Sequence, residues 1–390
     1  MATPAYVLDA RDGWARTISR SVPWFLYAVL FASASVIVGV TWDISWHRTI
    51  GRDTFWTPAH LAIYLGGIVA GLTCGWVALR LTFASGAAVA ADRAATVRFW
   101  GFRAPLGAWV CIWGAFAMLT SAPFDDWWHN SYGLDVKILS PPHALLAAGI
   151  GAIQFGAMLM AVAWQNRSDA MRARLGQLYL VSAGLLLVLL ATLATEYIQR
   201  WDMHRSLFYM VSAGVFPLIL VSTARASVSK WPATTTALVY MGFMFIMLLV
   251  LPLFRGEPLL GPIYVHVTNF VPPDFPLLLV VPALLIDLAM QRMGRGRDWR
   301  LSALAGVAFV AAFVAVQWPF ADFLMSPWAR NAIFVADRMD YGVDPTRQAL
   351  FFTLNQPDKL AFGLTAAVVL AFVSTRCGLW WGNWMSRVQR

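Results

Sequence analysis

Long apolar runs alternate with short polar segments along almost the whole chain. Several runs reach the roughly 20 residues that a helix needs to cross the hydrocarbon core of a bilayer. The pattern predicts ten membrane-spanning helices, at residues 23–42, 57–79, 104–121, 141–164, 176–195, 206–223, 232–253, 275–291, 301–321 and 360–375. We therefore expect an all-α polytopic membrane protein built from tandem helical hairpins.

Composition and charge support this prediction and indicate how the chain is oriented in the membrane. Of the 390 residues, 59% are hydrophobic and only 13% are charged, which excludes an ordinary soluble domain. Nineteen of the 29 Lys and Arg residues fall on one side of the predicted membrane, and by the positive-inside rule both termini are cytoplasmic. Topology thus explains the net charge of +9, and we expect no nucleic-acid partner.

The apolar runs also suggest how the chain is organised. Residues 1–22 form a cytoplasmic segment that does not resemble a cleavable signal peptide. Residues 23–165 form a four-helix region, residues 166–321 add further transmembrane helices, residues 322–359 form an outer amphipathic loop, and residues 360–390 hold the last helix and a basic C-terminus. We expect this protein in a bacterial inner membrane, surrounded by the lipid bilayer.

Two sets of one aspartate and two histidines recur at the outer ends of the first two predicted hairpins. In each set a histidine follows the aspartate by four residues, and a second histidine follows thirteen or fourteen residues later. The sets are Asp43, His47 and His60, and Asp125, His129 and His143.

The second histidine of each set lies at a predicted helix start. Thr57 and Ser140 are each followed by proline, and a Thr or Ser cap followed by proline is typical of a helix N-terminus. His60 and His143 then fall in the first turn. There the positive end of the helix dipole favours neutral imidazole, which is the form that binds a metal.

The spacing of each set suits a metal ion. Residues four apart share a helical face, so Asp43 and His47 point together if their helix continues about one turn past its apolar run. The short connection then brings His60 back beside them. Mixed imidazole and carboxylate ligation suits copper, zinc or iron better than magnesium or calcium, and three protein ligands leave a coordination position open.

Other polar residues have weaker claims to a site. Asp53, Asp126 and Asp135 are candidates for orienting an imidazole N–H. A purely structural alternative makes the aspartates helix-end anchors and pairs the acids with Arg48 and Arg52. A further set is expected to be structural, with a third metal site or a proton relay as the alternative: Glu196, Asp202, His204, His266 and Asp274.

The three cysteines give no comparable signal. Cys74, Cys111 and Cys377 are far apart in the sequence and lie in or near apolar runs. Their spacing indicates neither a disulfide framework nor a thiolate metal site.

Residues 52–60, RDTFWTPAH, resemble the RDTxFTPSH signature of the C subunit of copper membrane monooxygenases, the family of particulate methane and ammonia monooxygenases. One copper site of that subunit uses an Asp, a His four residues on and a His thirteen further, the spacing of Asp43, His47 and His60. A second site uses Asn in the position of Asp125. The resemblance covers residues 23–165, and the chain has no counterpart of the family's cupredoxin region.

The resemblance implies a copper-binding membrane oxidoreductase subunit, possessing one or two copper sites, that activates O₂ to oxidise a small substrate at the periplasmic face. Zinc or iron are the alternative metals. The implied partners are other oxygenase subunits or further copies of the chain, and a quinol or other electron donor.

Three other functions stay open at the level of sequence. The first is a non-enzymatic membrane protein that handles copper or zinc or assists assembly, although few polar residues continue inward through the predicted helices. The second is a haem b protein, in which the aspartates have no role. The third is a structural subunit of a respiratory or oxygenase complex.

Overall fold

The computed structural model describes residues 5–8, 15–18, 21–133, 140–336, 338–346 and 357–390. The long helices are α1 (Trp24–Thr49), α2 (Pro58–Phe83), α4 (Leu106–Tyr132), α5 (Pro141–Arg167), α6 (Arg172–Leu193), α7 (Ser206–Ala226), α8 (Pro232–Val250), α10 (Asp298–Met325) and α12 (Pro357–Met385). Two shorter helices are α3 (Ala87–Ala94) and α9 (Val280–Met293). Within the described residues, nine helices are long and apolar enough to cross a membrane, and the chain is a helical integral membrane protein.

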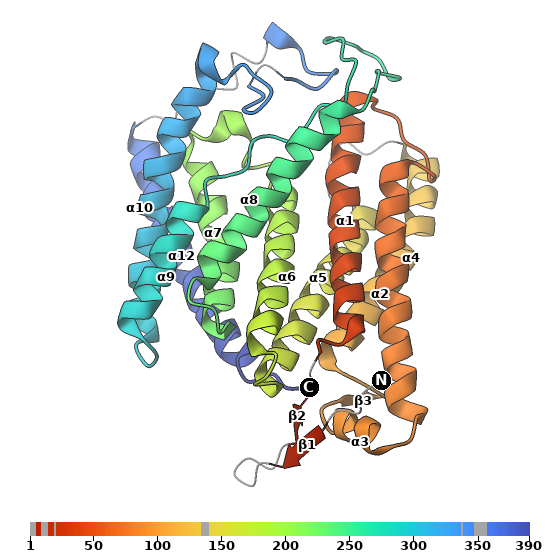
Figure 1. The fold of residues 1–390 in the computed structure, drawn as a ribbon. Coiled ribbons are helices and arrows are strands. Elements are labelled where there is room, and N and C mark those ends of the chain that lie inside the picture. The colour runs from red at the N-terminus through yellow and green to blue at the C-terminus, as the bar shows by residue number, and fades with distance from the viewer. Residues whose placement is uncertain (1–4, 9–14, 19–20, 134–139, 337, 347–356) are drawn as a thin grey trace.

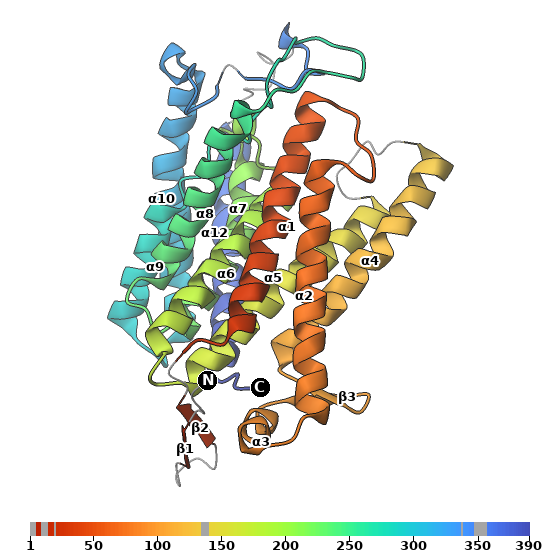
Figure 2. The same cartoon turned by 45° about the vertical axis from the view of Figure 1, so that its right-hand side comes forward.

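The helices stand side by side in one bundle (Figure 1). α1 packs along α2, α4 along α5, and α7 along α12, while α5 and α6 join the N-terminal helices to the rest. The described parts of both chain ends lie at the same end of the bundle, as Figures 1 and 2 show. The opposite end, where α1 and α4 end and α2 and α5 begin, is called the histidine-bearing end below.

The helix starts predicted from sequence are confirmed. Thr57 is the residue before α2 and Ser140 the residue before α5, and each is followed by proline at the first helical position. Ser140 Oγ accepts a hydrogen bond from the backbone N–H of His143 at 3.4 Å. This bond satisfies one of the backbone donors that a helix N-terminus leaves without an intrahelical partner.

Two helices continue past the apolar runs that predict them. α1 extends to Thr49, which places Asp43 and His47 on its last turns. α4 extends to Tyr132 and carries Asp125 and His129 in the same way. Both aspartate and histidine pairs therefore lie on one helical face at the histidine-bearing end, as the spacing predicts.

Glycines let α4 and α5 approach at backbone distance. A Cβ added to Gly114 would lie 2.7 Å from the Gly149 carbonyl oxygen, and one added to Gly149 would lie 2.8 Å from the Gly114 carbonyl oxygen. Small residues favour this kind of close helix packing in membranes. The contact fixes the distance between Asp125 on α4 and His143 on α5.

The predicted span at 275–291 is a 14-residue helix, α9, preceded by extended backbone. Pro272, Pro273 and Pro276 interrupt helical hydrogen bonding before it. Buried side chains satisfy the extended backbone instead: Leu277 N–H donates to Tyr240 Oη at 3.1 Å, and Leu278 N–H donates to Gln317 Oε1 at 3.0 Å.

Asp287 in α9 has a structural role. It accepts hydrogen bonds from the backbone N–H of Ala233 at 3.1 Å and of Thr234 at 2.9 Å, and from the Thr234 hydroxyl at 2.7 Å. These donors begin α8, so a side chain of α9 caps the neighbouring helix. These three hydrogen bonds explain the presence of a buried carboxylate here without a metal or a proton pathway.

The structure also contains two short antiparallel hairpins that the all-α prediction does not include. β1 (Ala5–Leu8) pairs with β2 (Ala15–Ile18), and β3 (Val97–Phe99) pairs with β4 (Phe102–Ala104). Both hairpins lie at the end opposite the histidine-bearing end (Figure 2).

Candidate metal centres

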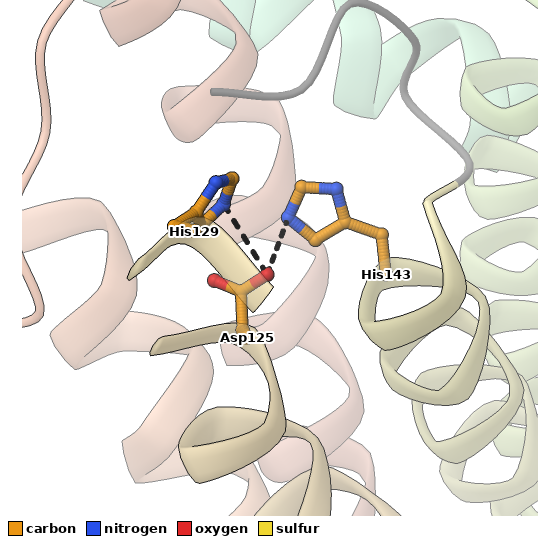
Figure 3. A group of neighbouring side chains, drawn as sticks. All are labelled: Asp125, His129 and His143. Carbon is orange, nitrogen blue, oxygen red and sulfur yellow. Dashed lines mark ion pairs between the residues drawn. The ribbon is translucent and has the colours of Figure 1, made fainter. Parts of the chain in front are cut away.

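Asp125, His129 and His143 come together as one group, called the second group below (Figure 3). The Nε2 atoms of His129 and His143 each lie 3.4 Å from Oδ1 of Asp125. The two imidazole rings are 6.1 Å apart between centroids. One ligand-type atom from each of the three residues lies within 4.8 Å of the others, a separation that one metal ion can bridge.

The end of α4 fixes the orientation of His129. Gly133 follows the helix with φ of 85°, a left-handed conformation that glycine adopts without strain. Its N–H donates to the His129 carbonyl at 3.0 Å, and its own carbonyl oxygen lies 2.9 Å from Nδ1 of His129. A carbonyl oxygen can only accept, so Nδ1 carries a proton and donates to it.

Asp43, Asp53 and His60 form the first group. Nε2 of His60 lies 3.2 Å from Oδ1 of Asp43 and 3.3 Å from Oδ2 of Asp53. His47 lies beside the group, with its Nε2 atom 3.5 Å from Oδ2 of Asp53 and 3.9 Å from Oδ2 of Asp43. Four side chains from α1, α2 and their connection thus converge.

The connection between α1 and α2 orients His60 as Gly133 orients His129. The carbonyl oxygen of Thr54 lies 2.9 Å from Nδ1 of His60 and accepts a hydrogen bond from it. Metal-binding histidines commonly donate their other ring N–H to a backbone carbonyl or carboxylate in this way.

The Asp53 carboxylate of the first group is held in the charged form that a metal requires. A hydrogen bond from His47 lowers the pKa of Asp53 to about 2, against the opposing effect of burial. Oδ1 of Asp43 is buried and receives no hydrogen bond of good geometry among the described residues, although Nε2 of His60 is 3.2 Å away.

These contacts determine what must lie between the imidazole Nε2 atom and the carboxylate oxygen in each group. With Nδ1 of His60 and His129 protonated, Nε2 of the neutral ring presents a lone pair to a carboxylate oxygen. Two acceptor atoms 3.2 to 3.4 Å apart repel one another unless a cation joins them. A proton on Nε2 or a metal ion between the atoms satisfies this requirement, so the residues fit a bound metal.

The first group differs in membership from the predicted set. Asp53, predicted to orient an imidazole from outside, lies among the ligand-type atoms, whereas His47 lies at its edge with a side chain that is 48% exposed. The loop after α1 folds back because Trp46 Nε1 donates to the Arg52 carbonyl at 2.9 Å, and this brings Asp53 over the group.

Arg48 does not point towards Asp43. Its side chain lies 2.5 Å from Oδ1 of Asp340 and 3.5 Å from Oδ1 of Asp274, and donates to the Pro272 carbonyl at 3.1 Å. One residue along an α-helix is a rotation of about 100°, so His47 and Arg48 face different sides of α1. The alternative in which Arg48 neutralises Asp43 is therefore wrong.

Loops from the second half of the chain hold the end of α1. Ser45 Oγ donates to the Val271 carbonyl at 2.6 Å, and Val271 N–H donates to Thr49 Oγ1 at 2.8 Å. Tyr341 N–H donates to the Arg48 carbonyl at 3.3 Å. These bonds position the turn of α1 that carries the first group.

The ionic contact between Arg48 and Asp274 gives a pH-dependent prediction. Burial alone would raise the pKa of Asp274, but the guanidinium groups of Arg48 and Arg200 hold it below its ordinary value. The folded-state pKa thus lies below the unfolded value of about 3.9, and ionised Asp274 stabilises the loops at neutral pH. That contribution is lost as pH falls from about 4 through the lowered pKa.

We expect pepsin to begin cleaving residues 326–346 of the Arg48→Ala variant at a higher pH than in the parent, because Asp274 then protonates more readily. Arg52→Ala is the control, since Arg52 is outside this ionic contact. The same onset of cleavage in the parent and in Arg48→Ala would contradict the assignment.

The remaining predicted residues lie apart from the two groups. Asp126 accepts a hydrogen bond from Asn130 at 3.3 Å, and Asp135 lies outside the described residues. The remaining five, Glu196, Asp202, His204, His266 and Asp274, do not build a third group of three metal-ligating side chains within the described part of the chain.

Besides Asp274, which lies beside Arg48, two more of these five have described partners. Asp202 pairs with Arg205 at 2.9 Å. His204 is buried, and its Nε2 lies 2.9 Å from Oδ1 of Asp322, whose side chain is exposed. Both contacts are those of structural polar residues, which the sequence favoured.

Fold and site together define a helical membrane protein with two aspartate–histidine groups at one end of its bundle. Comparisons with protein-family models, with curated proteins and with solved structures find no match to this chain. The likeness to the monooxygenase C subunit therefore stays a prediction from the sequence motif.

Proposed function

We propose that this protein holds two transition-metal ions at the histidine-bearing end and uses them in the oxidation of a small substrate by O₂. The observation that supports the proposal is the orientation of His60 and His129. In both, Nδ1 donates a hydrogen bond to a backbone carbonyl at 2.9 Å, so that Nε2 faces a carboxylate oxygen.

Each group supplies ligands that suit copper, zinc or iron. Asp43, Asp53 and His60 would hold one ion, with His47 able to join them, and the second group would hold the other. The sequence motif favours copper. When bound, copper supplies one-electron and O₂ chemistry that the side chains alone cannot perform.

The two groups differ in charge, which gives them different metal preferences. The first has two carboxylates, so a divalent ion makes it neutral overall. Among the residues that the structure describes, the second has one carboxylate, Asp125, which a monovalent ion would neutralise. Because unbalanced charge near a membrane is costly, the first group favours a divalent ion and the second accommodates copper in its monovalent form.

The chain's own residues prepare the site for substrate and O₂. They hold the imidazole rings in one tautomer and, with three protein ligands, leave coordination positions open. Trp127 and Tyr132, on the same helix turns as His129, are 53% and 67% exposed. Exposed aromatic side chains of this kind are typical of the membrane–water interface.

The test is metal analysis of the purified protein beside a variant in which His47, His60, His129 and His143 are all alanine. We expect the parent to hold about two copper equivalents more than the variant, one for each group. His266→Ala is the matched control, because this exposed histidine belongs to neither group.

Equal copper content in parent and quadruple variant would end the proposal. The oxidation step is tested separately, by O₂ uptake of the copper-loaded protein with a quinol and short alkanes or alcohols. Copper binding without uptake that depends on these histidines would leave a metal-binding membrane protein and remove the oxidase role.

A further inference from the structure

Three sulfur atoms from three helices meet in the interior of the N-terminal half of the bundle. They belong to Cys74 on α2, Cys111 on α4 and Met160 on α5, called the sulfur cluster below. The Cys74 thiol lies 4.0 Å from Sδ of Met160 and neighbours the Cys111 thiol, which donates to the Ile153 carbonyl at 3.7 Å. Both cysteines are free and fully buried, and Met160 is 1% exposed.

The sulfur cluster is separate from the two aspartate–histidine groups. Cys74 follows His60 by fourteen residues on the same helix, which is about 21 Å along its axis. Its surroundings are apolar and include Phe25, Ala108 and Ala157. Both thiols therefore lie in an apolar interior.

Single buried cysteines usually act as small apolar side chains. Here the arrangement is more specific, because a third helix adds a thioether to two adjacent thiols. Three metal–sulfur bonds of about 2.3 Å, the length found in zinc–thiolate sites, place neighbouring sulfur atoms about 4.0 Å apart when they are arranged at 120°. The Cys74–Met160 separation of 4.0 Å equals this value.

Close helix packing makes room for the sulfur atoms. A Cβ added to Gly156 would lie 2.5 Å from Cys111 Sγ and 2.7 Å from the Gly107 carbonyl oxygen, which is too close for either atom. A residue with a side chain at Gly156 would displace the thiol. Glycine therefore lets the Cys111 sulfur lie between α4 and α5.

We propose that the sulfur cluster binds a soft monovalent cation, Cu(I). Thiolate and thioether ligands select Cu(I) over harder ions. On binding, one thiol loses its proton to solvent and forms the metal–thiolate bond, while the second thiol and the thioether donate lone pairs. The product, one Cu⁺ and one thiolate, has no net charge, which an apolar interior requires. No electron is transferred.

The experiment uses Ag(I), a redox-inert ion of the same class, added to the full-length protein in lipid nanodiscs under reducing and anaerobic conditions. All proteins carry Cys377→Ser, because the exposed Cys377 thiol would bind silver by itself. They also carry the four histidine-to-alanine changes, so the aspartate–histidine groups do not contribute. The parent of this series is expected to retain one equivalent of silver against a competing chelator.

In that background, Cys74→Ser with Cys111→Ser is expected to lose the retained silver. Met160→Leu keeps both thiols and a similar volume, and it is expected to weaken silver binding at least about tenfold. Met158→Leu is the control, since Met158 is equally buried on α5 but lies outside the sulfur cluster.

Equal silver retention in parent and double serine variant would overturn the proposal. If the serine variant does not accumulate, Met160→Leu decides, and unchanged affinity there also overturns it. Because the histidine ligands are absent from the whole series, failure here leaves the proposed function intact, and failure of the histidine test leaves this inference intact.

Discussion

Asp125→Ala is expected to remove one of the two metal equivalents held by the aspartate–histidine groups. Asp125 is the carboxylate that faces both histidines of the second group, with Oδ1 3.4 Å from each Nε2 atom. It is the carboxylate that the described part of the chain contributes to this group. Mutation of a supporting partner alone typically costs 10–100-fold in metal affinity, so we expect loss of a direct ligand to cost at least about 100-fold.

The neighbouring residue supplies a matched control. Asp126→Ala removes the same charge from the same helix turn, but Asp126 contacts Asn130 rather than a histidine of the group. We expect two equivalents to remain. Asp125→Asn keeps an oxygen ligand and removes the charge, so its affinity is expected to lie between those of parent and alanine variant. Equal losses in both alanine variants, measured by metal titration, would show a general charge effect.

Gly149→Ala is expected to destabilise the fold and weaken the second group together. The added Cβ would lie 2.8 Å from the Gly114 carbonyl oxygen and 3.0 Å from the Met118 backbone nitrogen, so α4 and α5 must separate. Overpacking of this kind costs about 1–3 kcal/mol. Separation of the helices also draws His143 on α5 away from Asp125 on α4.

Gly151→Ala is the control for this prediction. It lies two residues along α5, where an added Cβ would meet Leu189 at 3.9 Å, an ordinary contact. Alanine is the better helix former by about 0.8–1.0 kcal/mol, so Gly151→Ala is expected to be neutral or stabilising. Apparent melting temperature and metal affinity are measured for both variants. A Gly149→Ala protein as stable as Gly151→Ala would mean that the helices do not pack as described.

Local patterns predicted much of the fold and the second group. Apolar runs of the right length gave the long helices, and the caps before Pro58 and Pro141 gave their starts. Four-residue spacing placed Asp125 and His129 on one face, and a short connection returned His143 to it. Each of these inferences needs only one helix or one hairpin, for which sequence is a sufficient guide.

Features that depend on distant contacts were not predictable in the same way. Asp53 joins the first group because the Trp46–Arg52 hydrogen bond folds back an irregular loop. α9 is short because side chains of α8 and α10, Tyr240 and Gln317, satisfy the extended backbone before it. The sulfur cluster requires three helices to be placed relative to one another, so its sequence spacing carries no signal.

The support of the α1 end has a consequence for shortened versions of the chain. The three ligand-type residues of the second group come from α4 and α5, whereas Ser45, Thr49 and Arg48 of α1 are bonded to the loops around Val271 and Asp340. A fragment ending after α5 would contain the three residues of the second group but would lack the loops that hold the last turns of α1, which carry Asp43 and His47. The two halves of the molecule are therefore not interchangeable modules, and evolution could trim or replace the later helices only by rebuilding the anchor of the first group.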